Sequence, residues 1–165
     1  MKSADYYIKR LELSPHSEGG YFKETYRSKG VIKKDALPND FQSDHCYSTF
    51  IYYLLKSSDI SKFHRIKSDE QWHFFEGSSL IVLALRENGE FLKFKLGRDL
   101  ENNEMFSCVI PANSWLAAYP REKDSFSLLG CTVAPGFEYE DFELAEKEEL
   151  LKQFPEYEAI IKKLT

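Results

Sequence analysis

Two histidines and three acidic residues stand among aromatic residues in the stretch SKFHRIKSDEQWHFFEG, from Ser61 to Gly77. A neutral imidazole offers a lone pair and a carboxylate a negative oxygen, so a converging pair can share a proton or bind a divalent metal. Alternation along two adjacent strands puts His64 and Glu70 on one face and His73 on the other. The spacing therefore predicts an acid–base pair or part of a metal site.

The elements that must position this pair are short strands. Aromatic and β-branched segments recur about every ten residues between turn signals such as Asn88-Gly89, which favours a sandwich or barrel. Ser3 is expected to cap a short N-terminal helix. Apolar residues from Leu144 onward follow helical spacing, and we expect this C-terminal helix to pack on the barrel or on a sister subunit. We predict an all-β domain spanning 1–165 with short helices at both ends. The expected strands are 21–27, 47–55, 63–66, 71–76, 80–86, 91–96, 106–110, 115–119, 126–133 and 137–142.

Composition narrows the class of protein. A formal net charge of −5 argues against nucleic acid as a partner, because phosphate binding needs concentrated Lys and Arg. The most apolar run, 80–85, is far shorter than the ~20 residues that span a bilayer, and the N-terminus lacks the apolar core of a signal peptide. Three widely spaced cysteines fit a reducing compartment. We expect a cytoplasmic protein without membrane or nucleic-acid partners.

The stretch around His64 resembles the first cupin motif. In that motif two histidines one residue apart precede a glutamate and a closing glycine on a strand–turn–strand unit. His64, Glu70 and Gly77 stand in register with it, while Ile66 occupies the position of the second histidine.

Residues 111–116 resemble the second cupin motif, Pro-x-Gly followed by a histidine. Asn113 replaces the glycine, which is reasonable where a left-handed backbone is required. Leu116 stands at the histidine position and cannot ligate a metal. Since a metal site usually needs three or more protein ligands, the resemblance implies no cofactor. A divalent metal stays open as an alternative if a further donor such as Glu24 contributes.

Four ordered blocks resemble one cupin family of unknown function, called DUF985 or cupin-5. This resemblance implies a double-stranded β-helix, or jelly roll, and a homodimer with strand exchange at the interface. The blocks are 16–28 (HSEGGYFKETYRS), 48–55 (STFIYYLL), 68–77 (SDEQWHFFEG) and 130–137 (GCTVAPGF).

The segments GGYFKE and FHR are loosely similar to the sugar-nucleotide 3,5-epimerases, which are metal-free jelly-roll enzymes. In those enzymes a pocket histidine removes a proton beside a carbonyl, and an acid, often tyrosine, delivers one to the opposite face. This similarity implies His64 as base, Glu70 as the group that orients it, and Tyr53 or Tyr26 as acid. It suggests an isomerase or epimerase acting on a sugar or nucleotide-sugar-like ligand.

Further residues are expected to contact such a ligand. Trp72 and Trp115 offer aromatic faces for a sugar or nucleobase, with plain core packing as the alternative. Glu24 and Tyr26 share a face with Phe22 on the strand 21–27, and this face is the one we expect to line the pocket.

Two other functions remain open from the sequence. One is a metal-dependent, dioxygenase-like cupin that uses His64 and Glu70, and the other is a ligand-binding module without catalysis. His64 and Glu70 also have purely structural interpretations. His64 could be a hydrogen-bonded histidine in the barrel wall, and Glu70 could be a carboxylate paired for structural reasons alone. His16 and His45 fall in predicted loops and receive no role.

Overall fold

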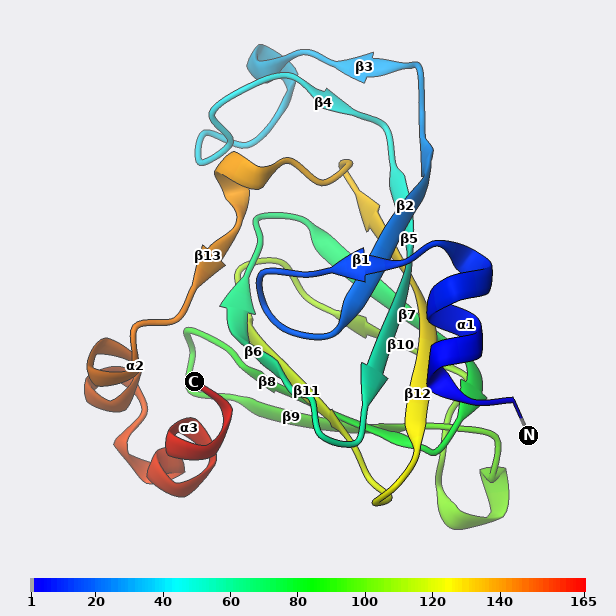
Figure 1. Ribbon diagram of the computed structural model, residues 1–165. Helices are drawn as coiled ribbons and strands as arrows, with labels where there is room; N and C mark the ends of the chain where they lie inside the picture. The colour runs from blue at the N-terminus through cyan, green and yellow to red at the C-terminus, as the bar shows by residue number, and fades with distance from the viewer. Residues whose placement is uncertain (1) are drawn as a thin grey trace.

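Two antiparallel sheets face each other in the computed structural model, which describes residues 2–165 (Figure 1). The larger sheet has the order β1 (Ser14–Pro15), β2 (Tyr21–Arg27), β5 (Thr49–Lys56), β12 (Phe126–Ala134), β7 (Asp69–Gly77) and β10 (Ser107–Ile110). The smaller sheet has the order β13 (Glu143–Leu144), β6 (Ser61–Arg65), β11 (Trp115–Pro120), β8 (Leu80–Leu85) and β9 (Phe91–Leu96). From β5 to β12 the chain alternates between the two sheets, except for the hairpin of β8 with β9 in the smaller sheet, and this is the winding of a jelly roll. A two-stranded extension, β3 (Val31–Ile32) with β4 (His45–Cys46), lies beyond one end of the sheets, at the top of Figure 1.

Most predicted strands are confirmed, with small shifts at their ends, but the strand predicted at 137–142 is wrong. That segment instead forms the 3₁₀ helix η3 (Tyr139–Asp141). The tight turn directs Phe137 and Phe142 into the barrel, whereas Tyr139 stays 62 % exposed. Alternating aromatic residues imitate a strand, but here the aromatic rings on either side of a helical turn face inward. Further single 3₁₀ turns are η1 (Lys34–Ala36) and η2 (Leu100–Asn102).

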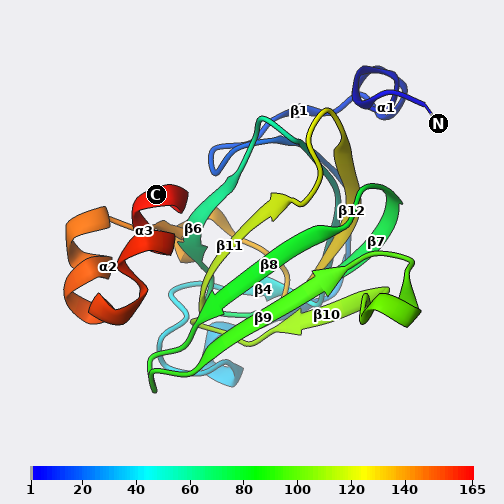
Figure 2. The same cartoon turned by 90° about the horizontal axis from the view of Figure 1, so that it is seen from below.

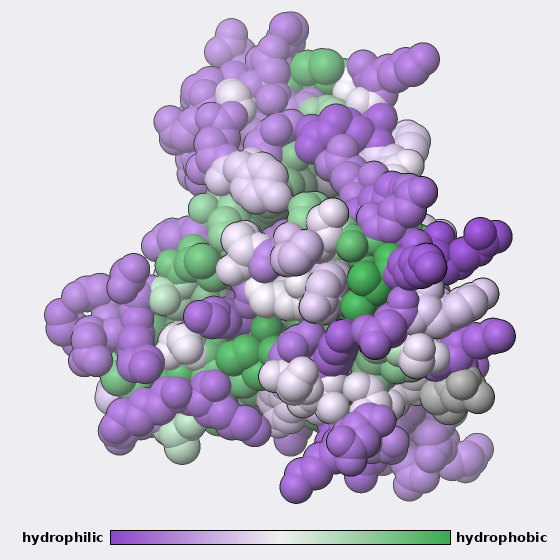
Figure 3. Space-filling model, viewed as in Figure 1, coloured by the Kyte–Doolittle hydropathy of each residue, from purple (hydrophilic) through white to green (hydrophobic). Residues whose placement is uncertain are grey.

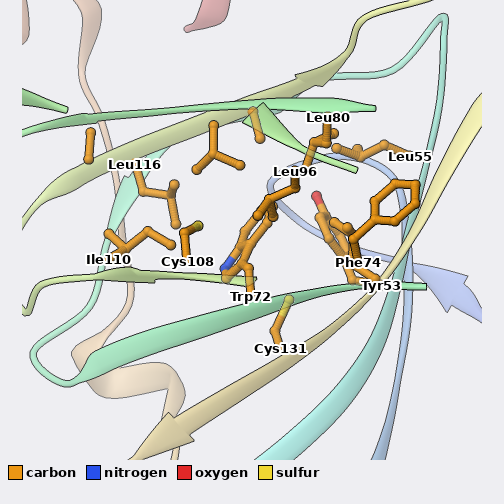
Figure 4. Packing of buried hydrophobic residues seen from close by; sticks show 14 residues of the cluster. Tyr53, Leu55, Trp72, Phe74, Leu80, Leu96, Cys108, Ile110, Leu116 and Cys131 are labelled. Carbon is orange, nitrogen blue, oxygen red and sulfur yellow. The ribbon is translucent and has the colours of Figure 1, made fainter. Parts of the chain in front are cut away.

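The main core fills the space between the sheets (Figure 4). Large aromatic residues from the larger sheet meet aliphatic residues from the smaller one. Tyr53 and Trp72 pack edge to face with ring centroids 5.7 Å apart, and Leu116 projects toward them from β11. This packing leaves the region beyond Tyr53 and Trp72 unfilled, and the cavity described below lies there.

Helices cover the outer faces of both sheets. In α1 (Ala4–Leu11) the N-cap Ser3 accepts a hydrogen bond from the Tyr6 amide, as predicted, and the helix packs against the larger sheet. The C-terminal helices α2 (Lys147–Gln153), η4 (Pro155–Tyr157) and α3 (Glu158–Leu164) pack on the smaller sheet (Figure 2). Packing of the C-terminal tail on the barrel is therefore confirmed. None of the helices within residues 2–165 combines the length and apolar composition needed to cross a membrane.

Trp115 belongs to this outer helix–sheet interface. Its indole N–H donates to Gln153 of α2 (3.2 Å), and the guanidinium of Arg65 lies 4.4 Å from the centre of its ring. The prediction that Trp115 contacts a ligand in the barrel is thus wrong, because its side chain points away from the barrel interior. Leu116, the next residue, faces inward instead.

Candidate functional site

A partly open cavity lies between the sheets. In the view of Figure 3 hydrophobic residues gather in the middle of the molecule, bordered by hydrophilic ones. Aromatic and ionisable side chains make up most of the cavity wall. The aromatic ones are Phe22, Tyr53, Trp72, Phe137 and Phe142, and the ionisable acids and imidazoles are His16, Glu18, His64 and Glu70.

His64 pairs with Glu18, and not with Glu70 as predicted. Its Nε2 lies 3.0 Å from Glu18 Oε2, and its Nδ1 lies 2.7 Å from the carbonyl oxygen of Lys62. The Lys62 carbonyl can only accept, so Nδ1 carries a proton, and one further proton lies between Nε2 and the Glu18 carboxyl group. The other oxygen of Glu18 accepts from the Ser61 hydroxyl at 2.9 Å. The geometry defines a buried histidine–carboxyl pair whose hydrogen-bonding groups are already engaged.

The turn between β1 and β2 brings Glu18 into the barrel. Gly19 and Gly20 have φ angles of +116° and +69°, which residues other than glycine rarely adopt. A Cβ on Gly19 would lie only 2.0 Å from the carbonyl oxygen of Ile60. This close approach lets the Lys62 amide donate to the Glu18 carbonyl at 2.9 Å. The Gly19-Gly20 pair is the feature of the sequence that could have pointed to Glu18 as a cavity residue, but by itself the pair indicates only a turn.

Glu70 projects from β7 into the same cavity and has a different environment. It is 8 % exposed, and no hydrogen bond or ion pair within residues 2–165 engages its carboxyl group. Burial raises the pKa of Glu70 to about 7. Of the neighbouring groups, His64 lowers this pKa, Glu18 raises it and the Trp72 indole N–H lowers it. The indole nitrogen of Trp72 is itself buried without a hydrogen-bond partner. Glu70 is thus an available acid or base at neutral pH.

His16, which received no role from the sequence, also lines the cavity. Its Nδ1 accepts from the backbone N–H of Glu18 at 3.3 Å, so the proton of the neutral ring resides on Nε2. Burial lowers the pKa of His16 and favours this neutral form. Nε2–H has no partner within the described chain and can donate to a ligand. A loop histidine gives no periodic signal, which is why the sequence did not reveal it.

The remaining predicted site residues divide into two groups. Tyr53 and Trp72 line the cavity, but the Tyr53 hydroxyl donates to the Gly19 carbonyl at 2.8 Å. Glu24 and Tyr26 lie outside it, since Glu24 forms an ion pair with Arg27 at 2.9 Å and Tyr26 is 55 % exposed. On this face of β2 only Phe22 lines the cavity, and a bulge separates Glu24 from Tyr26 further along the strand. The expectation that this whole face lines the pocket is therefore wrong beyond Phe22.

The side chains at the cupin ligand positions do not fit a metal ion. Ile66 and Leu116 replace two donors, and both nitrogens of His64 are engaged elsewhere. Within residues 2–165 no three His, Cys, Asp or Glu side chains cluster in a way that could hold a metal. Glu24, the predicted extra donor, lies outside the cavity. The backbone at Asn113 has a φ angle of +62°. This confirms the left-handed conformation that was predicted at the position where asparagine replaces the glycine of the motif.

Two facing antiparallel sheets with jelly-roll winding, an internal cavity, and His64, Glu70 and Gly77 on one strand–turn–strand unit define a cupin. Within the cupin superfamily, the chain belongs to the family DUF985, whose model matches residues 5–145.

Relatives and solved structures agree with this assignment. The uncharacterized protein YML079W of Saccharomyces cerevisiae is 32 % identical over 88 % of this chain and 76 % of its own length. The crystal structure of protein SO0799 from Shewanella oneidensis has a TM-score of 0.90 at 35 % identity, covering 100 % of this chain and 98 % of that one. An oxalate decarboxylase of Bacillus subtilis shares the fold alone, with a TM-score of 0.56 at 17 % identity over 92 % of this chain and 36 % of its own.

Proposed function

We propose that the chain binds a small organic ligand in the barrel cavity and that Glu70 exchanges a proton with it. The observation that carries this proposal is a buried, unpaired carboxyl group that faces an aromatic cavity. Its pKa of about 7 keeps acid and base forms populated at neutral pH, as proton-transfer catalysis requires. A carboxyl group whose ionised form is destabilised by burial, and which has no structural partner, is typical of a functional site.

The positions of the neighbouring groups favour an isomerase-type reaction. Glu70 would remove a proton beside a carbonyl and return it to an adjacent position, with no metal involved. The His16 Nε2–H would donate to the carbonyl oxygen and stabilise the negative charge that develops there. His64 does not fit the predicted role of base, since a base needs a free lone pair. Its contribution is to hold Glu18 at 3.0 Å and so to position the turn that carries His16.

The walls support a compact ligand with one apolar face. The rings of Phe22, Trp72 and Phe142 offer the contact area that a sugar ring or a similar frame needs. Within residues 2–165 no Lys or Arg lines the cavity, so the diphosphate of a nucleotide sugar would find no cation there. We therefore narrow the predicted sugar or nucleotide-sugar-like ligand to a molecule without phosphate in the cavity.

Solvent hydrogen exchange tests the proposal. Neutral ketoses and small ketones, beginning with dihydroxyacetone and fructose, are incubated with the protein in D₂O, and incorporation beside the carbonyl is followed by NMR. We expect exchange by the wild type and a loss of about 100-fold or more in Glu70→Gln, the usual contribution of a general acid–base group. Glu76→Gln is the matched control, because Glu76 lies on the same strand and pairs with Arg98 outside the cavity. Undiminished exchange in Glu70→Gln would contradict the proposal, and ligand binding without exchange would leave the chain a binding module.

A further inference from the structure

Given the proposed function, on which this inference rests, we propose that the ligand carries a positive charge. The side chains of the cavity wall suit a compact organic cation, such as a protonated amine or a quaternary ammonium group on an apolar frame. Such a ligand would place its charged group against Glu70 and its carbon atoms against the aromatic walls. Three properties of the cavity lead to this class of ligand.

The first property is the charge balance of the cavity wall. Glu18 and His64 share a proton across 3.0 Å, so the pair carries no net charge. His16 contributes no charge, because its Nδ1 accepts a hydrogen bond from the Glu18 amide. An ionised Glu70 is then the one charge in the wall, within the described residues, that lacks a counter-ion. A ligand with a single positive charge would neutralise the site.

The second property is the cost of leaving Glu70 without a partner. A buried carboxylate is stable only when it is paired or hydrogen-bonded, and in the free protein this cost is visible as the raised pKa of Glu70. A bound ammonium group would remove the cost by supplying the missing counter-ion. A neutral ligand would leave the cost in place, and an anionic ligand would add to it.

The third property is the aromatic wall. Aromatic rings attract cations electrostatically, most strongly when the pair is desolvated, and aromatic pockets are a common way to bind quaternary ammonium groups. The cavity wall contains rings from two separate parts of the chain, Trp72 on β7 and Phe137 and Phe142 on the segment that flanks η3. These rings are the surfaces that would surround the methyl or methylene groups next to the charge.

Three probes of nearly equal shape separate charge from size. Choline is the cation, 3,3-dimethylbutan-1-ol is its neutral carbon isostere, and 3,3-dimethylbutanoate is an anion of similar bulk. Their affinities are measured at pH 8 by isothermal titration calorimetry, supported by NMR shift changes of residues in the cavity wall. We expect choline to bind at least 10-fold more tightly than the alcohol, and the anion to bind more weakly than both.

Two variants assign the preference to one carboxylate. Glu70→Gln is expected to reduce the ratio between choline and the alcohol to about one. Glu24→Gln, which removes a carboxylate outside the cavity, should leave the ratio as in the wild type. The choline affinity of the wild type should also fall as the pH drops below about 7, because Glu70 takes up a proton. The other ionisable groups that line the cavity are unchanged in both variants; they are Glu18, His64, His16, Tyr53 and Cys131.

The outcomes distinguish this inference from the proposed function. Equal affinity for choline and the alcohol overturns the inference and leaves a cavity that binds small molecules. A preference that persists in Glu70→Gln also overturns it, because the charge would then be recognised by another group. If none of the three probes binds, the charge inference is overturned, whereas the proposed function is tested separately by hydrogen exchange into the ketoses.

Discussion

Replacing Glu70 by Gln is expected to raise the free energy of unfolding by about 3 kcal/mol at pH 8, while the gain disappears below about pH 4.5. The pKa of Glu70 is raised from 4.5 to about 7 because the carboxyl group is buried, and each pH unit corresponds to about 1.4 kcal/mol. The measurement is urea unfolding of both proteins between pH 4 and pH 8.5. A gain in stability from removing a charge would identify Glu70 as a group retained at a cost to the fold.

The sign of the pH dependence follows from which state binds more protons. Between pH 4.5 and about 7 the folded protein keeps the Glu70 proton, whereas the unfolded chain has released it. The Glu70 contribution to stability therefore falls as the pH rises through this window and is constant above it. The difference between variant and wild type isolates this effect from all other titrating groups. If the wild type and Glu70→Gln were equally stable at pH 8, Glu70 would ionise without a free-energy cost. This result would contradict the expected cost of burying its charge.

Replacing Glu18 by Ala is expected to lower the free energy of unfolding by about 3 kcal/mol, because it removes the buried carboxyl group that pairs with His64. Glu18 contacts His64 at 3.0 Å and the Ser61 hydroxyl at 2.9 Å, and all three side chains are buried. Chemical denaturation at pH 7 measures the loss. The ¹⁵N shifts of the His64 ring report on the pair directly, with two protonated nitrogens expected in the wild type and one in the variant.

An exposed ion pair provides the control for Glu18→Ala. Glu12 pairs with Lys23 at 2.5 Å, but the Glu12 side chain is 77 % exposed. Glu12→Ala should change the free energy of unfolding by less than about 1 kcal/mol, as is usual for surface ion pairs. If Glu18→Ala cost no more than Glu12→Ala, the pair of Glu18 with His64 would not be the structural centre of the site.

Much of the fold could be predicted because the strands are short and bounded by turns. The strands at 21–27 and 91–96 match their predicted ends, and the motif residues fixed the winding through the family resemblance. The face of β7 was also predictable, since Glu70 and Trp72 line the cavity whereas His73 bonds to Thr132 on the opposite face. Alternation determines which residues share a face, and here that is enough to place Glu70.

The face of β11 could not be predicted in the same way. Both of its faces are buried, one against the core and one against the C-terminal helices, so its residues are apolar throughout. Without a polar side the alternation gives no direction, and Trp115 was placed inside when it lies outside. A strand covered on both faces loses the signal that alternation normally supplies.

The partner of His64 was beyond the reach of local patterns for another reason. Glu18 and His64 come from a turn and a strand that are far apart in sequence, and their contact depends on the positive φ angles of Gly19 and Gly20. The sequence indicates a turn at this position but not where the turn lies in space. The homodimer and the cytoplasmic location that the sequence suggested stay predictions.

The central claim is that Glu70 is a buried, unpaired carboxyl group available to a ligand in the barrel cavity. A ¹³C NMR titration of the glutamate carboxyl carbons, with Glu70→Gln used to assign the resonance, tests it most directly. We expect Glu70 to titrate near pH 7 in the free protein and at lower pH when choline is bound. A Glu70 resonance that titrates near the ordinary value of 4.5, with or without choline, would contradict it.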